Sequence, residues 1–312
     1  MLTRRHLRIK VMQSLYSFFK TEKKEIYTDL FFLEQSIKNT FSLYVLLLSY
    51  LKALYDHSIK IKGDVKKVKT LVISDKFKFI IGNDILRFIS KHNSLNRFIT
   101  RIKANNWEVN LDYVNSNYEK LLASNFFKAY ENIKRPSLKE QRLFVSNFYK
   151  EIIVASENFF DYLEDSQITW IDDYPVVNTF LLKQIPKIDP KKSDSLPFPN
   201  LSKTSEDFKF GTKLFKKVIS SNIDLNKELE GRTPNWDSKR IAMIDLILIK
   251  MATVELMYFP EIPEKVTINE YVEISKDYST PKSKIFINGI LDKIVKDFQH
   301  SNRLLKEGKG LL

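Results

Sequence analysis

Hydrophobic residues recur at helical spacing through most of the chain. In the first twenty residues, Leu7, Val11 and Leu15 fall on one face of a helical wheel, as in an amphipathic helix that packs on a core. The same period predicts helices at 3–20, 28–58, 76–92, 94–105, 110–132, 137–164, 172–185, 206–229, 237–258, 265–278 and 281–298. Residues 59–75 alternate instead and contain Gly63, which favours extended chain there. The pattern as a whole predicts an all-α protein.

Prolines divide this helical pattern. Four prolines lie among serines and lysines between residues 186 and 203, which predicts a linker at that point. The most apolar run, residues 41–51, stops at Lys52 and is well short of the roughly 20 residues that a membrane span requires. We therefore interpret this run as a buried helix and expect no membrane association.

The composition offers little for catalysis. The chain has no cysteine and only seven glycines, so it has no disulfides, no thiolate metal sites and no glycine-rich phosphate loop. Its four histidines are scattered, without a pair at metal-ligand spacing. We therefore expect no enzymatic activity, no metal and no cofactor, and a reducing cytoplasmic environment suits a chain without cysteine.

The net charge of +13 is concentrated in two segments. Residues 1–20 contain five lysines and arginines and no acidic residue. Residues 60–103 contain twelve lysines and arginines against three aspartates. Concentrated positive charge is typical of nucleic-acid contact, but a solvated lysine-rich face gives the same pattern. Both interpretations of residues 60–103 remain open from the sequence.

Arginines stand at the start of the first helix. Arg4 and Arg8 lie on the same stripe as the apolar positions, and Arg5 is beside them. A cation cannot lie unpaired in an apolar core, so we expect these turns to project toward water or an anion. The planar donor fork of arginine suits phosphate. The alternative is an exposed, frayed basic terminus.

Four segments resemble the NusB family of bacterial transcription antitermination factors. Residues 4–18, RRHLRIKVMQSLYSF, resemble the family's arginine-rich first helix, and residues 240–256 resemble its central helix, with Lys250 where arginine is usual. Residues 262–270, IPEKVTINE, resemble its P-x-K-V-x-I-N-E segment, and residues 286–293, FINGILDK, its F-V-N-G-V-L-D-K segment. The resemblance covers about a third of the chain. Residues 21–205 stand where compact family members have a short connection.

This resemblance implies an all-helical, non-enzymatic RNA-binding protein in the cytoplasm. Family members pair with the small-subunit ribosomal protein also called NusE, bind boxA RNA of ribosomal RNA transcripts, and join the RNA polymerase antitermination complex. The alternative is a ribosome-assembly module that binds a ribosomal protein and ribosomal RNA. The expected organisation is a NusB-like bundle with a large inserted helical domain: first helix 1–20, inserted domain 21–190, linker 191–205, NusB-like domain 206–298 and basic tail 299–312.

The final helix offers a second candidate RNA contact. Residues 279–281, Ser-Thr-Pro, predict a helix start whose free N–H groups, with Lys282 and Lys284 beside them, would receive a phosphate. The resemblance implies that a base stacks on Phe286, although helical spacing alone favours a core position. The full candidate set for RNA binding is Arg4, Arg5, Arg8, Tyr16, Lys282, Lys284 and Phe286.

Five signature residues are expected to be structural. Polar side chains in apolar helices need partners when they are buried. We therefore expect the polar members to tie the last helices together, with direct RNA contact as the alternative. Glycine costs a helix about 1 kcal/mol relative to alanine, so a close helix crossing is the simplest reason for the glycine. The five are Asn269, Glu270, Asn288, Gly289 and Asp292.

Overall fold

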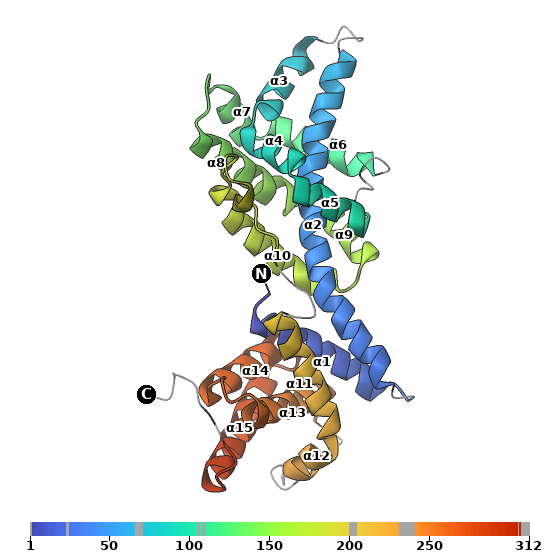
Figure 1. The fold of residues 1–312 in the computed structure, drawn as a ribbon, viewed down its shortest axis with the longest axis vertical. Coiled ribbons are helices and arrows are strands. Elements are labelled where there is room, and N and C mark those ends of the chain that lie inside the picture. The colour runs from blue at the N-terminus through green and yellow to red at the C-terminus, as the bar shows by residue number, and fades with distance from the viewer. Residues whose placement is uncertain are drawn as a thin grey trace. The chain divides into compact units, whose positions relative to one another are not determined.

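The structure is a computed structural model that describes residues 2–22, 25–65, 71–104, 107, 110–199, 205–230, 241–304 and 306 (Figure 1). Every regular element among these residues is a helix, which confirms the all-α prediction. The chain divides into two compact units. Unit 1 is Lys38–Asn200, and unit 2 combines Leu2–Ile37 with Leu201–Leu312. No helix in the described part is long and apolar enough to cross a membrane.

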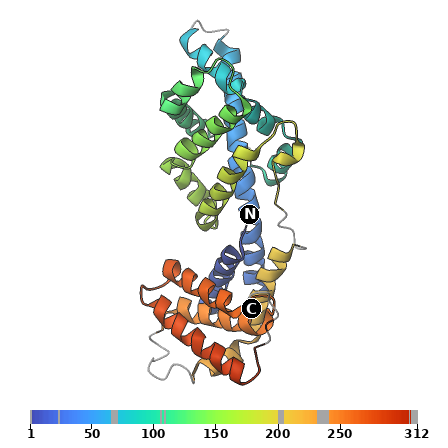
Figure 2. The same cartoon turned by 90° about the vertical axis from the view of Figure 1, so that its left-hand side faces the viewer.

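Unit 2 is a bundle around one central helix. It contains α1 (Arg4–Lys20), the first part of α2 (Ile26–Val65), α11 (Glu206–Ser220), α12 (Asn222–Glu230), α13 (Met243–Tyr258), α14 (Glu264–Tyr278) and α15 (Ser283–His300). Helix α13 packs against α1, α11, α12, α14 and α15 and is buried on nearly all sides (Figure 2). Gly211 of α11 faces α1, where a β-carbon would lie 3.9 Å from Val11. The continuous apolar run of α13 therefore builds the centre of this unit.

Unit 1 is a second helical bundle. After the remainder of α2 it contains α3 (Leu71–Ile81), α4 (Asp84–Lys91), α5 (Asn93–Ile102), α6 (Leu111–Ala123), α7 (Asn125–Glu131), α8 (Leu138–Phe148), α9 (Glu157–Ser166) and α10 (Trp170–Gln184). One π-helical turn, Tyr149–Ile153, follows α8 directly. Two 3-10 turns, Ile185–Lys187 and Ser193–Ser195, follow α10.

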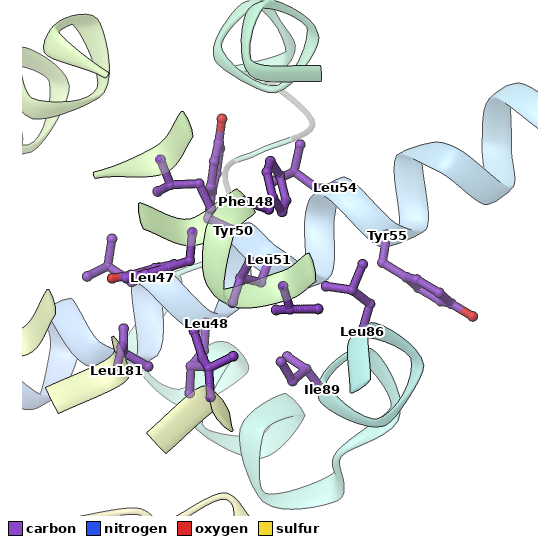
Figure 3. Packing of buried hydrophobic residues seen from close by; sticks show 14 of the residues in the cluster. Leu47, Leu48, Tyr50, Leu51, Leu54, Tyr55, Leu86, Ile89, Phe148 and Leu181 are labelled. Carbon is purple, nitrogen blue, oxygen red and sulfur yellow. The ribbon is translucent and has the colours of Figure 1, made fainter. Parts of the chain in front are cut away.

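The apolar run of α2 forms the core of unit 1, which confirms the predicted buried helix. Leu47, Leu48 and Leu51 are fully buried (Figure 3). Around them lie Phe148 of α8 and Leu181 of α10, which are also buried and belong to the same cluster (Figure 3). A helix enclosed on all sides needs apolar residues on every face, and this explains why the run lacks a polar stripe.

Several predicted elements differ from the observed ones. The extended chain expected at 59–75 is wrong, because α2 continues to Val65 and α3 begins at Leu71. The helix expected at 76–92 is broken at Asn83, whose side chain accepts hydrogen bonds from the backbone N–H groups of Ile85 and Leu86. Ser124 breaks the 110–132 helix in the same way. The observed helices are therefore shorter than the predicted ones, because capping side chains interrupt the periodic runs.

The proline-rich segment is not a free linker up to residue 199. Leu196 is buried in the core of unit 1, and the ring of Phe198 lies 5.1 Å from that of Phe98. The Tyr44 hydroxyl donates a 2.6 Å hydrogen bond to the Pro197 carbonyl. The apolar residues between the prolines hold this segment on unit 1, which corrects the expectation for 191–199. Residues 200–204 lie outside the described residues.

The limits of unit 2 also differ from the expected ones. Residues 21–37, which the sequence assigned to the inserted domain, belong to unit 2. Leu33 and Ile37 are fully buried, and Ile37 lies beside Gly211 of α11. At the other end α15 continues to His300, into the expected basic tail, and Lys306 donates hydrogen bonds to backbone carbonyls of unit 2. Residues 305 and 307–312 lie outside the described part.

Candidate nucleic-acid interface

Arg8 forms a buried ion pair with Glu255 of α13. The Arg8 side chain is 2% exposed and that of Glu255 is 0% exposed. The guanidinium donates two parallel hydrogen bonds, from Nε to Oε2 at 2.8 Å and from Nη2 to Oε1 at 2.7 Å. Burial acts to lower the pKa of Arg8, but the hydrogen bonds and charge of Glu255 outweigh burial and raise it. Arg8 therefore stays charged inside the bundle.

Two hydroxyl groups complete the surroundings of this carboxylate. Thr267 donates a 2.8 Å hydrogen bond and Tyr271 a 3.1 Å hydrogen bond to the Glu255 carboxylate. The Arg8 guanidinium also lies 5.4 Å from the centre of the Phe210 ring. Bidentate pairing with further hydrogen bonds is the arrangement that offsets the cost of desolvating two charges.

Arg5 pairs with Glu270 of α14. Its guanidinium donates two hydrogen bonds to the Glu270 carboxylate, at 3.0 and 2.8 Å, and Nη1 of Arg8 lies 3.4 Å from the same carboxylate. The hydrogen bonds from Arg5 lower the pKa of Glu270, against the opposing effect of burial. The Arg5 side chain is nevertheless 43% exposed, so it retains a face toward solvent.

Arg4 is the most open of the three arginines. Its side chain is 45% exposed, and its contact with Glu261 is long, at 3.8 Å. The guanidinium also lies 5.2 Å from the centre of the Phe210 ring. A shallow hollow opens between the start of α1 and the start of α14, lined by all three arginines and by Glu261 and Glu270. Because Glu255 balances the charge of Arg8, the two remaining cations and the two carboxylates of this hollow also balance, and Arg4 and Arg5 keep exposed faces beside them.

The structure changes the reason for the arginine stripe. The sequence predicts that the first turns of α1 project toward water or an anion. The anion that Arg8 meets is internal, because α13 presents Glu255 to α1. Arg8 consequently has no free face for phosphate, and we assign it the role of positioning Arg5 through the shared Glu270 carboxylate.

Tyr16 lies further along α1. Its ring is 39% exposed, and the Lys20 ammonium lies 5.8 Å from the ring centre. Tyr16 stands eleven residues after Arg5, which returns nearly to the same helix face about 16 Å away. The exposed part of α1 therefore presents cations at its start and an aromatic ring near its end.

The start of α15 differs from the predicted one. The helix begins at Ser283, two residues later than expected, and Ser283 is buried. The hydroxyls of Ser279 and Ser283 donate hydrogen bonds of 2.6 and 2.7 Å to the buried carboxylate of Asp245. These hydroxyls are therefore turned inward, whereas the two lysines at this helix start are directed to solvent.

Lys282 and Lys284 are exposed beside this turn, and Phe286 is partly buried one turn later. Ile285, directly after Lys284, is 72% exposed. A single exposed apolar residue is common on protein surfaces, but this one stands beside two exposed lysines. This end of α15 therefore offers both charge and apolar area to a partner.

The two groups of candidate residues lie at opposite ends of α13. Glu255 pairs with Arg8 near the start of α1, whereas Asp245 bonds to Ser283 at the start of α15. Ten residues of helix separate these two anchors, about 15 Å. Lys250 lies between them, 5.1 Å from the centre of the Phe19 ring, so the end of α1 lies against the middle of α13. A bound strand would have to cross this distance.

Most signature residues are not buried. Asn269, Asn288, Gly289 and Asp292 are all exposed. Asn288 donates a 3.0 Å hydrogen bond to Asp292 within α15 itself, so the expectation that this pair ties helices together is wrong. The close crossing expected at Gly289 is also wrong, because a β-carbon there would meet nothing within 4 Å. Only Glu270 links two helices, α14 and α1.

Sequence reasoning missed Glu255 and Asp245 as partners. They are the two acidic residues of α13, whose sequence is otherwise mostly apolar. A buried carboxylate requires a hydrogen-bond donor. An acidic residue in an apolar helix therefore indicates a buried pair, but it does not identify the donor. For Glu255 the donor, Arg8, is 247 residues away in the sequence. In the described part of the chain, no group of three or more His, Asp or Glu side chains is arranged to hold a metal ion.

The comparisons with known proteins agree with this architecture. The NusB family model matches residues 186–296. The transcription antitermination protein NusB of Salinibacter ruber is 42% identical over 103 residues, which are 33% of this chain and 64% of that protein. NusB of Geotalea daltonii is 40% identical over 96 residues, 31% of this chain and 66% of that protein. NusB of Chloroherpeton thalassium is 39% identical over 108 residues, which are 35% of this chain and 50% of that protein.

The matched region therefore spans between 50% and 66% of the length of these relatives. No solved structure matches the chain. The match includes the last residues of unit 1, 186–200, and α11 to α14 with most of α15, the helices that form unit 2 with α1. Residues 186–296 are a NusB family domain, and the chain carries a long additional region ahead of it.

Proposed function

We propose that the protein is a non-enzymatic, RNA-binding transcription antitermination factor. The observation that supports this most is the surface of unit 2, where Arg4 is exposed on α1 and Lys282 and Lys284 are exposed within the segment that matches NusB. The relatives that share this domain are named transcription antitermination proteins. Exposed arginine and lysine near aromatic rings is the chemistry that holds a single-stranded nucleic acid.

The finer proposal is that the RNA is the boxA element of ribosomal RNA transcripts. In this proposal Arg4 and Arg5 hold phosphates, Lys282 and Lys284 hold the strand further along, and a base stacks on Phe286 with Tyr16 beside the path. NusE is the protein partner, and the complex joins elongating RNA polymerase in the cytoplasm. Arg8 acts indirectly, because it fixes Glu270 and through it Arg5.

Replacing Arg4, Lys282 and Lys284 together with glutamine is expected to weaken binding of a boxA-containing RNA by roughly tenfold or more at about 0.1 M salt. A variant with fewer phosphate contacts releases fewer counterions when it binds, so the slope of log K against log salt should become shallower by about 2. Fluorescence polarisation over a salt series measures both quantities. The melting temperature should hardly change, because the side chains are exposed.

The matched control replaces Lys209, Lys216 and Lys227 with glutamine, which removes the same charge from exposed positions on α11 and α12. Equal losses in the two triple variants would mean that only net charge matters. Phe286→Leu is a further arm of the same assay, since it keeps apolar bulk and removes the ring face. Normal binding with a large loss of stability would place Phe286 in the core.

The alternative of a ribosome-assembly module is decided by the same samples. An antitermination factor should bind boxA RNA more tightly when NusE is present, because the two proteins bind as a complex. A module that docks on a ribosomal protein would bind NusE without preferring boxA over a scrambled RNA of the same length.

A further inference from the structure

Helix α5 of unit 1 carries an unpaired basic face. Between residues 91 and 104 the chain has four cations and no acidic residue. All four cations are exposed, and none forms an ion pair with another described residue: Lys91, Arg97, Arg101 and Lys103. Arg97 donates only to the hydroxyl of Ser94. Their charge is therefore available to an external anion.

Neutral hydrogen-bonding groups accompany these cations. A shallow hollow on the same face is lined by Asn93, Asn96, Arg97 and Thr100. The apolar residues of α5 point the other way, with Leu95 and Ile99 buried in the core. Because the face lacks the exposed aromatic or aliphatic anchor that protein interfaces require, it fits phosphates and sugars better than a protein surface.

The backbone at Lys103 gives an independent observation. Lys103 caps α5 in the left-handed conformation, with φ of 56°. Glycine is the residue that adopts this conformation without strain, and it is the usual residue where helices end in this way. Lysine is less stable than glycine in this conformation, so the chain keeps a cation at a position where glycine would give a more stable fold.

Two helices of unit 1 carry charge of one sign only. Helix α9 contains four acidic residues and no basic one, and α5 contains two arginines and no acidic residue. On an ordinary solvated surface the two signs are interspersed, as they are on α4, α6 and α8. The concentration on α5 instead resembles the electrostatic footprint of a nucleic-acid site. Two acidic residues are close by. Asp194 follows Ser193, whose carbonyl lies 2.9 Å from a ring nitrogen of His92, and Asp56 accepts a 2.7 Å hydrogen bond from the Ser90 hydroxyl and pairs with Lys52.

We propose that this α5 face binds the phosphate backbone of RNA without reading its sequence. Arg97, Arg101 and Lys103 supply the charge, and the Asn93 amide donates further hydrogen bonds to phosphate or ribose oxygens. The additional unit thereby gives the chain a second RNA contact that the NusB domain alone lacks. The inference stands on unit 1 and is tested separately from the boxA proposal.

The test uses the full chain and two labelled RNAs, one of about 12 nucleotides with boxA alone and one of about 30 with boxA between uridine flanks. The variant is Arg97→Gln with Arg101→Gln and Lys103→Gln. It should bind the long RNA about tenfold more weakly at about 50 mM salt, with a salt slope shallower by about 2. Binding of the short RNA should not change.

The matched control replaces the exposed Lys128, Lys134 and Lys139 of unit 1 with glutamine. Equal binding of the long RNA by the two variants overturns the proposal. So does an unchanged RNA affinity accompanied by lost binding to a ribosomal protein, which would assign the face to a protein partner. If the Arg4, Lys282 and Lys284 variant leaves the short RNA unaffected, the boxA proposal fails, but the flanked RNA still decides the role of α5.

Lys103→Gly separates binding from folding. The substitution removes one cation and relieves the left-handed backbone, so the melting temperature should stay equal or rise. Affinity for the long RNA should nevertheless fall about two- to threefold, as expected for one lost phosphate contact. A rise in melting temperature with unchanged RNA affinity would exclude Lys103 from the contact and leave the strained lysine without this explanation.

Discussion

Arg8→Met is expected to destabilise unit 2 by about 3–5 kcal/mol, the usual cost of breaking a buried ion pair. Methionine fills much of the space but leaves the Glu255 carboxylate buried without its two strongest donors. Urea unfolding followed by circular dichroism measures the loss. Arg4→Met is the matched control on the same helix, and it should change the free energy of unfolding by less than about 0.5 kcal/mol because Arg4 is exposed.

A double-mutant cycle tests whether the pair itself is responsible. Glu255→Gln removes the charge and keeps one acceptor oxygen for Thr267 or Tyr271, while its amide N–H can donate to the other hydroxyl. The double variant, Arg8→Met with Glu255→Gln, should lose less stability than the two single losses added together, because no charge is left buried. If Arg8→Met costs no more than Arg4→Met, the ion pair does not stabilise the bundle.

Phe148→Ala is expected to cost about 3–5 kcal/mol, in unit 1 alone. Phe148 is 1% exposed and packs in the core around α2, so its removal leaves a cavity among residues that cannot easily close it (Figure 3). Hydrogen exchange should show that backbone amides lose protection in α2, α4 and α8 and keep it in α13. Binding of boxA RNA should change little.

Leu143→Ala is the control for this substitution. Leu143 lies on the same helix but is 58% exposed, so its truncation should stay within about 0.5 kcal/mol. Loss of exchange protection in α13 as strong as in α2 would contradict the prediction, because it would show that the core of unit 1 also maintains unit 2.

Local periodicity predicted the helices but not their ends. The stripe of Leu7, Val11 and Leu15 is a property of neighbouring residues, and it led directly to α1. The breaks at Asn83 and Ser124 depend on side chains that cap a helix, and the same residues are common inside helices on exposed faces. Extended chain was expected at 59–75 because a short alternating run cannot be told from one face of a helix.

The candidate site was predicted in its parts but not in its pairing. The arginines were singled out because cations interrupt an apolar stripe, and the resemblance to NusB added Lys282, Lys284 and Phe286. No local pattern reveals that Arg8 meets Glu255 or that Ser283 meets Asp245. These contacts join residues far apart in the sequence, so they follow from the packing of α13 and not from any one segment.

The division of unit 2 into two distant segments has a consequence for how the protein folds. Arg8 and Glu255 are 247 residues apart, and ribosomes add roughly 5–20 residues per second. The ribosome therefore makes α1 roughly 12–50 seconds before its central partner exists. Unit 1, which ends at Asn200, is complete before α13 is made and can fold first, with its entry and exit held together by Tyr44 and Pro197. A folded insertion shortens the loop that α1 must close, so the additional unit lowers the entropy cost of assembling the domain that it interrupts.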